Sequence, residues 1–119
     1  MKDNIIRDKS FNFAIRIVNL YKFLVDKREY VLSKQLLRSG TSIGANVEEA
    51  LGGQTEKDFL YKLSIAYKEA RETKYWIRLL RETKYISDNA YLSIFEDCDE
   101  LCRIIGKIQI TMKEKIRNS

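Results

Sequence analysis

The residue types that this chain lacks limit the chemistry it could perform. It has no histidine among its 119 residues, so the commonest general base and metal ligand of proteins is absent. Serines and threonines are plentiful, but an activated nucleophile would then need a lysine or a carboxylate as its base, and no spacing indicates such a pair. The sequence therefore predicts a protein that is not an enzyme and that carries no cofactor.

Two groups of potential metal ligands have simpler interpretations. Cys98 and Cys102 are four residues apart, which on a helix puts them on one face and disfavours a disulfide. Without histidine or further cysteines they cannot complete a common zinc site, so we interpret them as small core residues in a reducing cytoplasm. An acidic cluster lacks the glycine and alternating oxygens of a calcium loop, and we interpret it as a solvated face rather than a cation site. Its residues are Glu96, Asp97, Asp99 and Glu100.

Phosphate binding is the chemistry that the charged residues do suggest. Four cations recur at steps of three, four and three residues on one helical face, away from the apolar stripe. The row is either a solvated face, partly neutralised by nearby glutamates, or a track for a polyanion, because phosphate contacts need only positioned cations. The net charge of +5 permits such a partner. The candidate nucleic-acid-binding residues are Arg71, Lys74, Arg78 and Arg81, with Arg38 as a further candidate.

A run of small residues from Arg38 to Ala50 departs from ordinary helix composition. The apolar positions within and before it keep helical steps, so we predict one helix whose middle is small enough to let a neighbouring backbone approach. A glycine-rich phosphate loop is the alternative, but no Lys-Ser or Lys-Thr pair follows the glycines and no strand pattern precedes them. We expect Asn46 to be half-buried, with its amide bonded to a neighbouring helix, and Glu49 to be solvated or salt-bridged. The candidate structural or interface residues are Gly40, Ile43, Gly44, Asn46, Glu49 and Trp76.

Apolar periodicity predicts four helices, at about 10–27, 31–51, 55–82 and 87–115, in one domain that spans 1–119. Ser10, Thr55 and Ser87 are the expected N-caps. The segment 1–9 is expected to be frayed or loosely docked. A charged segment from 26 to 29 is expected to form the first turn, and Gly52-Gly53 should close the second helix in a left-handed conformation.

Heptad spacing in the third and fourth predicted helices indicates long, nearly parallel packing. With short connections, this predicts an all-α protein, an antiparallel up-and-down four-helix bundle. A longer coiled coil of two or three helices would require Gly52-Gly53 to be helical. Trp76 lies beside the third helix's stripe, and the tyrosines around it either widen the buried face or face a second subunit. No apolar segment of membrane-spanning length occurs, so we expect a cytoplasmic protein with no membrane partner.

The residues also resemble a known family. LLRSGTSIGANVEEALGG, followed by DFLYKLSIAYKEARETKYWIRLL, is similar to the small bacterial four-helix-bundle proteins encoded in intervening sequences of 23S rRNA genes. The resemblance runs from FAIRIVNLYKFL to the last helix. It implies a homopentamer, and an association with RNA or with a nucleic-acid-bound protein, because similar proteins act as accessory variability factors beside retroelement reverse transcriptases.

Two functional hypotheses follow from the residues and the resemblance. The first is a non-catalytic oligomeric adaptor that binds RNA or a ribonucleoprotein through basic surface. The second is an oligomeric scaffold for protein interactions that does not bind nucleic acid, in which case the positive charge is incidental. RNA affinity that falls steeply with salt would favour the first.

Overall fold

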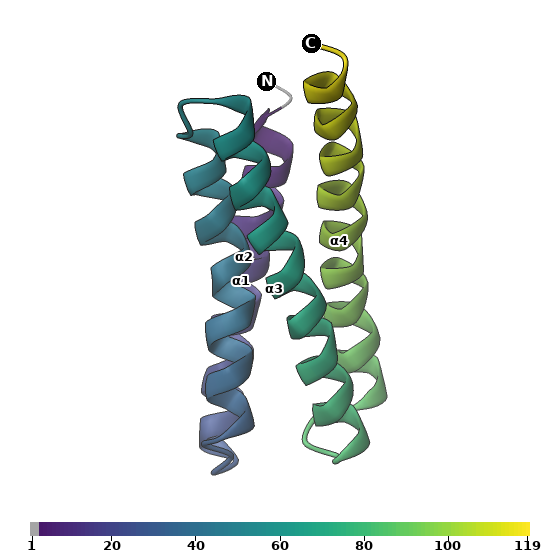
Figure 1. The fold of residues 1–119 in the computed structure, drawn as a ribbon. Helices are drawn as coiled ribbons and strands as arrows, with labels where there is room; N and C mark the ends of the chain where they lie inside the picture. The colour runs from purple at the N-terminus through teal and green to yellow at the C-terminus, as the bar shows by residue number, and fades with distance from the viewer. Residues whose placement is uncertain (1–2) are drawn as a thin grey trace.

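Four helices account for nearly all of the computed structural model, which describes residues 3–119 (Figure 1). They are α1 (Asp3–Asp26), α2 (Leu32–Leu51), α3 (Glu56–Glu82) and α4 (Asp88–Arg117). Successive helices reverse direction through short turns, which confirms the predicted antiparallel up-and-down bundle (Figure 1). None of these helices has an apolar window that could cross a bilayer.

Each helix packs mainly on the next one in the chain. α3 crosses obliquely from α2 at one end to α4 at the other (Figure 1), and of the helix pairs that are in contact, α1 and α4 touch least. The heptad stripes of α3 and α4 supply much of the core, as predicted. Its fully buried members include Leu63, Ala66, Ala70, Ile77, Leu80, Cys98, Leu101 and Ile105.

The small residues of α2 allow it to pack closely on α1, as the sequence predicts. A Cβ atom on Gly40 would lie 2.7 Å from Cγ1 of Ile17, and one on Gly44 would lie 3.2 Å from the carbonyl oxygen of Ser10. Ile43 is fully buried between these two glycines. The glycines are therefore required by a neighbouring helix and not by a turn or a bound phosphate.

The first helix begins earlier than predicted. α1 starts at Asp3, not near residue 10, and Ile6 is buried in the core, so the part of 1–9 that the structure describes is not frayed. Residues 1–2 lie outside the described residues. Ser10 is not an N-cap: it is buried in mid-helix, where its hydroxyl donates to the carbonyl of Arg7. Its small side chain suits the close approach of α2 at Gly44.

A buried carboxylate holds the turn between α1 and α2. Glu29 is only 8% exposed, and its two oxygens accept hydrogen bonds from the backbone N–H groups of Ser33, at 2.6 Å, and Val31, at 3.2 Å. The Ser33 hydroxyl donates back to the Glu29 carbonyl at 2.7 Å. Glu29 thus satisfies amide groups at the start of α2 that have no partner within the helix.

At the other helix ends, the structure confirms two predicted N-caps and corrects one predicted C-terminal conformation. Thr55 and Ser87 accept hydrogen bonds from the backbone N–H groups of Asp58 and Ala90, which confirms both caps. Gly52 follows α2 but has φ −87°, and Gly53 has no positive φ either, so the predicted left-handed glycine is wrong. Among the described residues, the left-handed positions belong to Arg28 and Lys84, with φ 64° and 68°.

We expect Lys84→Gly to stabilise the protein by about 0.5–1 kcal/mol. A left-handed conformation costs a side-chain-bearing residue roughly 1–2 kcal/mol, whereas glycine avoids that cost but loses some backbone entropy on folding. Urea unfolding of the variant would measure the gain. Lys84→Ala is the matched control, because it removes the same charge and keeps the left-handed strain. A glycine variant no more stable than the alanine variant would contradict this account.

Candidate nucleic-acid interface

The predicted row of cations lies along the side of α3 that faces α4. Arg71, Lys74 and Arg78 line a groove between these two helices with a volume of about 700 Å³. An adjoining hollow of about 250 Å³ is lined by Arg78 and Arg81. The structure therefore brings all four cations of the row to one groove system.

Lys74 and Arg81 are tied to carboxylates of α4. Lys74 Nζ lies 2.8 Å from Asp99 Oδ1, and Arg81 Nε lies 3.1 Å from Asp88 Oδ1. The hydrogen bond to Asp99 raises the pKa of Lys74, and the same bond holds the pKa of Asp99 below its usual value. These two cations hold α3 against α4, and each has a carboxylate of α4 beside it that offsets part of its charge.

Arg71 and Arg78 differ from the other two cations. Both are exposed, and neither forms an ion pair with any residue that the structure describes. Asp99 also pairs with Arg103, so that one carboxylate is shared by two cations and the side chains around it remain net positive. The groove therefore keeps positive charge available to an anion, concentrated on the two arginines.

Aromatic rings line the same groove. Tyr91 and Phe95 of α4 lie with their centroids 5.1 Å apart, and Tyr67 of α3 packs beside Gly106. Tyr75 is 55% exposed and borders both hollows. From the sequence, Tyr67 and Tyr75 were expected to widen a buried face or to contact a subunit, and not to line a groove. The alternation of aromatic and basic residues at steps of four and three on α3 is the pattern that could have indicated it.

The two cysteines lie beside the groove. Both are free and buried, as predicted, with Cys102 forming part of the groove wall. Cys98 Sγ lies 3.4 Å from the carbonyl oxygen of Ala70. The interaction with Cys102, together with burial, raises the pKa of the Cys98 thiol. A buried thiol with a raised pKa is a poor nucleophile, so Cys98 suits packing rather than reaction.

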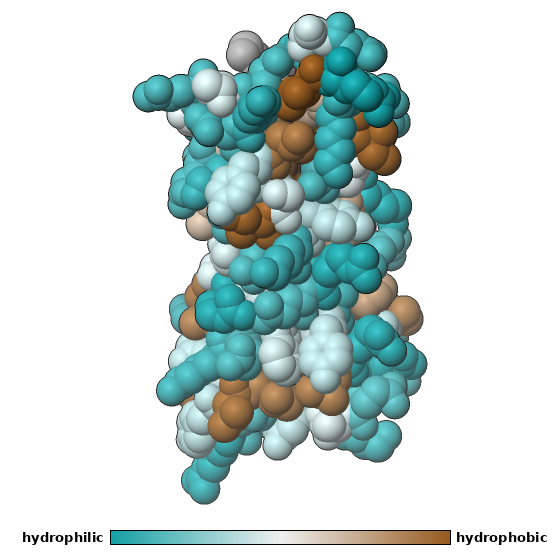
Figure 2. Space-filling view, in the orientation of Figure 1, coloured by the Kyte–Doolittle hydropathy of each residue, from teal (hydrophilic) through white to brown (hydrophobic). Residues whose placement is uncertain are grey.

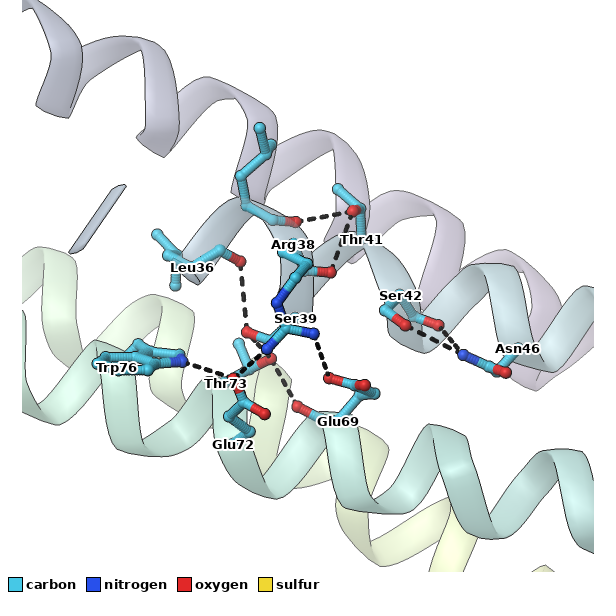
Figure 3. A network of polar contacts seen from close by, with 11 residues as sticks. Leu36, Arg38, Ser39, Thr41, Ser42, Asn46, Glu69, Glu72, Thr73 and Trp76 are labelled. Carbon is cyan, nitrogen blue, oxygen red and sulfur yellow. Dashed lines mark hydrogen bonds and ion pairs between the residues drawn. The ribbon is translucent and has the colours of Figure 1, made fainter. Parts of the chain in front are cut away.

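Arg38 lies away from this groove, in a polar network between α2 and α3 (Figure 3). Its guanidinium pairs with Glu72 and lies 3.6 Å from Glu69 Oε1, while the indole N–H of Trp76 donates to Glu72 at 3.0 Å. Thr73 Oγ1 lies 3.0 Å from Ser39 Oγ across the same buried interface. Arg38 therefore joins α2 to α3 through two glutamates that offset its charge, and Trp76 holds one of them, Glu72, from within α3.

Two further predictions about polar residues can be compared with the structure. The Asn46 amide does not reach a neighbouring helix: it donates to the carbonyl and the hydroxyl of Ser42 on its own helix, at 2.9 and 3.0 Å (Figure 3). The reason is that the i−4 groups lie within reach of the short side chain. Glu49 is salt-bridged, one of the two predicted alternatives, with Lys62 Nζ 2.6 Å from its carboxylate.

The acidic cluster of α4 is not simply a solvated face. Asp97 pairs with Arg16 at 2.5 Å and Glu100 with Lys9 at 3.2 Å, and both pairs join α4 to α1. In the part of the chain that the structure describes, no group of three or more histidine, cysteine, aspartate or glutamate residues is arranged to hold a metal ion. The cluster serves to join α4 to its neighbours.

Known proteins share both the sequence pattern and the architecture. A model of the 23S rRNA-intervening sequence protein family matches residues 2–107. One similar solved structure is described as a protein of unknown function from the S23 ribosomal protein family of Bacteroides thetaiotaomicron. It is 55% identical, with a TM-score of 0.89, and the match covers 92% of this chain and 98% of that chain. No curated protein matches the sequence.

Proposed function

The chain belongs to the family of 23S rRNA-intervening sequence proteins, and from this membership we propose that it is a non-catalytic adaptor that binds RNA or a ribonucleoprotein. The observation that carries the proposal is the pair of exposed arginines, Arg71 and Arg78, beside a groove whose other cations are already paired. Phosphates are the natural partners of exposed guanidinium groups, which can donate two parallel hydrogen bonds to them.

We further propose that the adaptor works as an assembly of identical subunits, a homopentamer. Apolar side chains on one side of α1 support an interface with a second copy. Phe11 is 65% exposed and Ile15 is 47% exposed, and the half-buried Val18 continues the same side. A chain with a net charge of +5 is a moderate attractor of polyanions, but the charges of several copies in one assembly add together.

Replacing both groove arginines should weaken RNA binding about tenfold or more. Arg71→Gln/Arg78→Gln removes the cations without breaking an ion pair to a described residue, so the bundle should stay folded. The dependence of affinity on salt should also become less steep, by about 0.7–0.9 in log–log slope for each phosphate that the variant no longer neutralises. Titration of a structured RNA at several salt concentrations, with circular dichroism for folding, measures both effects.

Lys34→Gln/Lys57→Gln is the matched control. Both lysines are exposed and lie outside the groove lining, so the control removes the same charge elsewhere. It should weaken binding far less than the arginine pair does. Equal losses in the two variants would show that only net charge matters, and unchanged binding in the arginine variant would refute the groove as the RNA site.

The alternative is an oligomeric scaffold for another protein. The ion pairs of Lys74 and Arg81 within the bundle favour this alternative, because they leave less positive charge available to RNA. Light scattering separates the two. A mass near that of a pentamer at low and high salt, with a salt-sensitive rise when RNA is added, supports the adaptor. A pentamer that ignores RNA and captures one protein at high salt supports the scaffold.

A further inference from the structure

Tyr75 is placed between the two exposed arginines of α3. It follows Arg71 by four residues and precedes Arg78 by three, so the three side chains share one helical face. Tyr75 is 55% exposed, so a partner can reach its ring from the groove. The hydroxyl-bearing ring borders both the groove of about 700 Å³ and the hollow beside it.

The other rings in the groove are already engaged. Arg81 lies over the ring of Tyr91, 4.6 Å from its centroid, and Lys74 lies 5.2 Å from the centroid of Phe95. Tyr67 packs against Gly106, where a Cβ atom would meet the ring at 3.4 Å. Tyr75 has no such cation over it in the described chain.

Tyr75 is also held in position. Its ring meets Trp76 edge to face, with centroids 5.0 Å apart and planes at 76°. Trp76 is itself fixed by the hydrogen bond from its indole to Glu72, which in turn pairs with Arg38 (Figure 3). An exposed ring with an anchored neighbour is preorganised to receive a flat partner, because little conformational freedom remains to be given up on binding.

On these grounds we propose that the α3–α4 groove binds single-stranded RNA, with an unpaired base stacked on Tyr75 and flanking phosphates on Arg71 and Arg78. The proposal rests on the proposed RNA-binding function and adds the form of RNA that is bound. Aromatic platforms between cations are how proteins hold single strands without reading sequence. The groove's volume lies in the range that pockets for small ligands have, so a base can enter it.

A double helix fits these residues less well. Its bases are stacked inside, and an A-form duplex presents mainly phosphates and 2′-hydroxyls to a protein. It would reach Arg71 and Arg78 but leave the ring of Tyr75 without a partner. On the face where α3 runs between α2 and α4, the space-filling view shows apolar and hydrophilic patches in alternation (Figure 2).

The test compares an unstructured RNA oligonucleotide with a fully paired RNA duplex that has the same number of phosphates. Tyr75→Ala should weaken binding of the single strand about tenfold or more, in line with stacking losses at other such sites, and should leave duplex binding within about twofold. Tyr75→Phe keeps the ring and should bind like the wild type. Tyr61→Ala, which removes another exposed tyrosine of α3, is the matched control and should change nothing.

A spectroscopic readout reports on the site directly. Trp76 is the chain's single tryptophan and touches Tyr75, so a stacked base should quench its fluorescence, and Tyr75→Ala should abolish the quenching. The salt dependence of binding should not change in Tyr75→Ala, because both phosphate-binding arginines remain.

The outcomes distinguish a failure of this inference from a failure of the proposed RNA-binding function on which it rests. If Arg71→Gln/Arg78→Gln weakens RNA binding as expected but Tyr75→Ala binds the single strand like the wild type, the stacking site is wrong and the adaptor proposal stands. Equal losses for single strand and duplex in Tyr75→Ala would also overturn it. Equally tight binding of a free mononucleotide would overturn the proposal, because the ligand of the groove would then be a nucleotide and not an RNA strand.

Discussion

Gly40→Ala should destabilise the bundle by about 1–2 kcal/mol, although alanine is the better helix former. The new Cβ atom would lie 2.7, 2.8 and 2.9 Å from three side-chain atoms of Ile17, which is fully buried and, as a β-branched residue, stiff at χ1. Overpacking of this kind costs about 1–3 kcal/mol, which outweighs a gain in helix propensity of roughly 1 kcal/mol.

A double-mutant cycle tests whether contact with Ile17 causes this loss of stability. Ile17→Ala alone should cost about 2–5 kcal/mol because it opens a cavity. In that background the clashing atoms are gone, so Gly40→Ala should become stabilising, by up to about 1 kcal/mol. Urea unfolding of the four proteins gives the coupling energy. An equal cost of Gly40→Ala in both backgrounds would show that Ile17 is not what excludes a side chain at this position.

Gly106→Ala provides the comparison within the same protein. A Cβ atom there would meet Tyr67 at 3.4 Å, an ordinary van der Waals distance. We expect it to be neutral or stabilising by about 0.5–1 kcal/mol, as for other mid-helix glycines.

Glu29→Ala should lower the free energy of unfolding by about 2–3 kcal/mol. It removes both hydrogen bonds that the carboxylate accepts at the start of α2 and leaves the Ser33 N–H buried without a partner. Hydrogen bonds to a charged group contribute about 1.5–3 kcal/mol, and an unsatisfied buried donor adds its own desolvation cost. Thermal and urea unfolding monitored by circular dichroism would measure the loss.

Two further variants show what Glu29 contributes. Glu29→Gln keeps one accepting oxygen for the two amide donors, so its stability should fall between those of the wild type and the alanine variant. Glu56→Ala removes a more exposed carboxylate whose ion pair with Lys115 spans 2.6 Å, and it should cost less than about 1 kcal/mol. Similar costs for Glu29→Ala and Glu56→Ala would refute a special role for the buried cap.

The sequence predicted the bundle well where apolar periodicity was long and regular. Leu63, Ala66 and Ala70 are buried as the heptad in α3 requires, and Gly40 lies where a neighbouring helix comes close, although the small-residue run did not show which helix that would be. The sequence-based prediction failed at the start of α1, because Ile6 is the one buried residue among 5–9, where burial is described, and one apolar position establishes no period. It also misplaced the left-handed residues, since hydrogen bonds closing α1 and α3 put Arg28 and Lys84 there at the expense of local preference.

Only part of the candidate site could be predicted from the sequence. Helical spacing was enough to place Arg71 and Arg78 on one face of α3. It could not show that Lys74 is paired, because its partner Asp99 lies on another helix and within-helix spacing carries no information about packing between helices. For the same reason, the Tyr91 and Phe95 rings of α4 were not assigned to the groove.

The sparse packing between α1 and α4 has a consequence for how this chain folds. Most contacts join consecutive helices, so contact order is low and helical hairpins can form before the first and last helices meet. The α1–α4 interface includes partly exposed ion pairs, such as Arg16 with Asp97, so it is the place where local opening should cost the least free energy. The groove lies between α3 and α4, on the better-packed side, and should keep its shape through such openings.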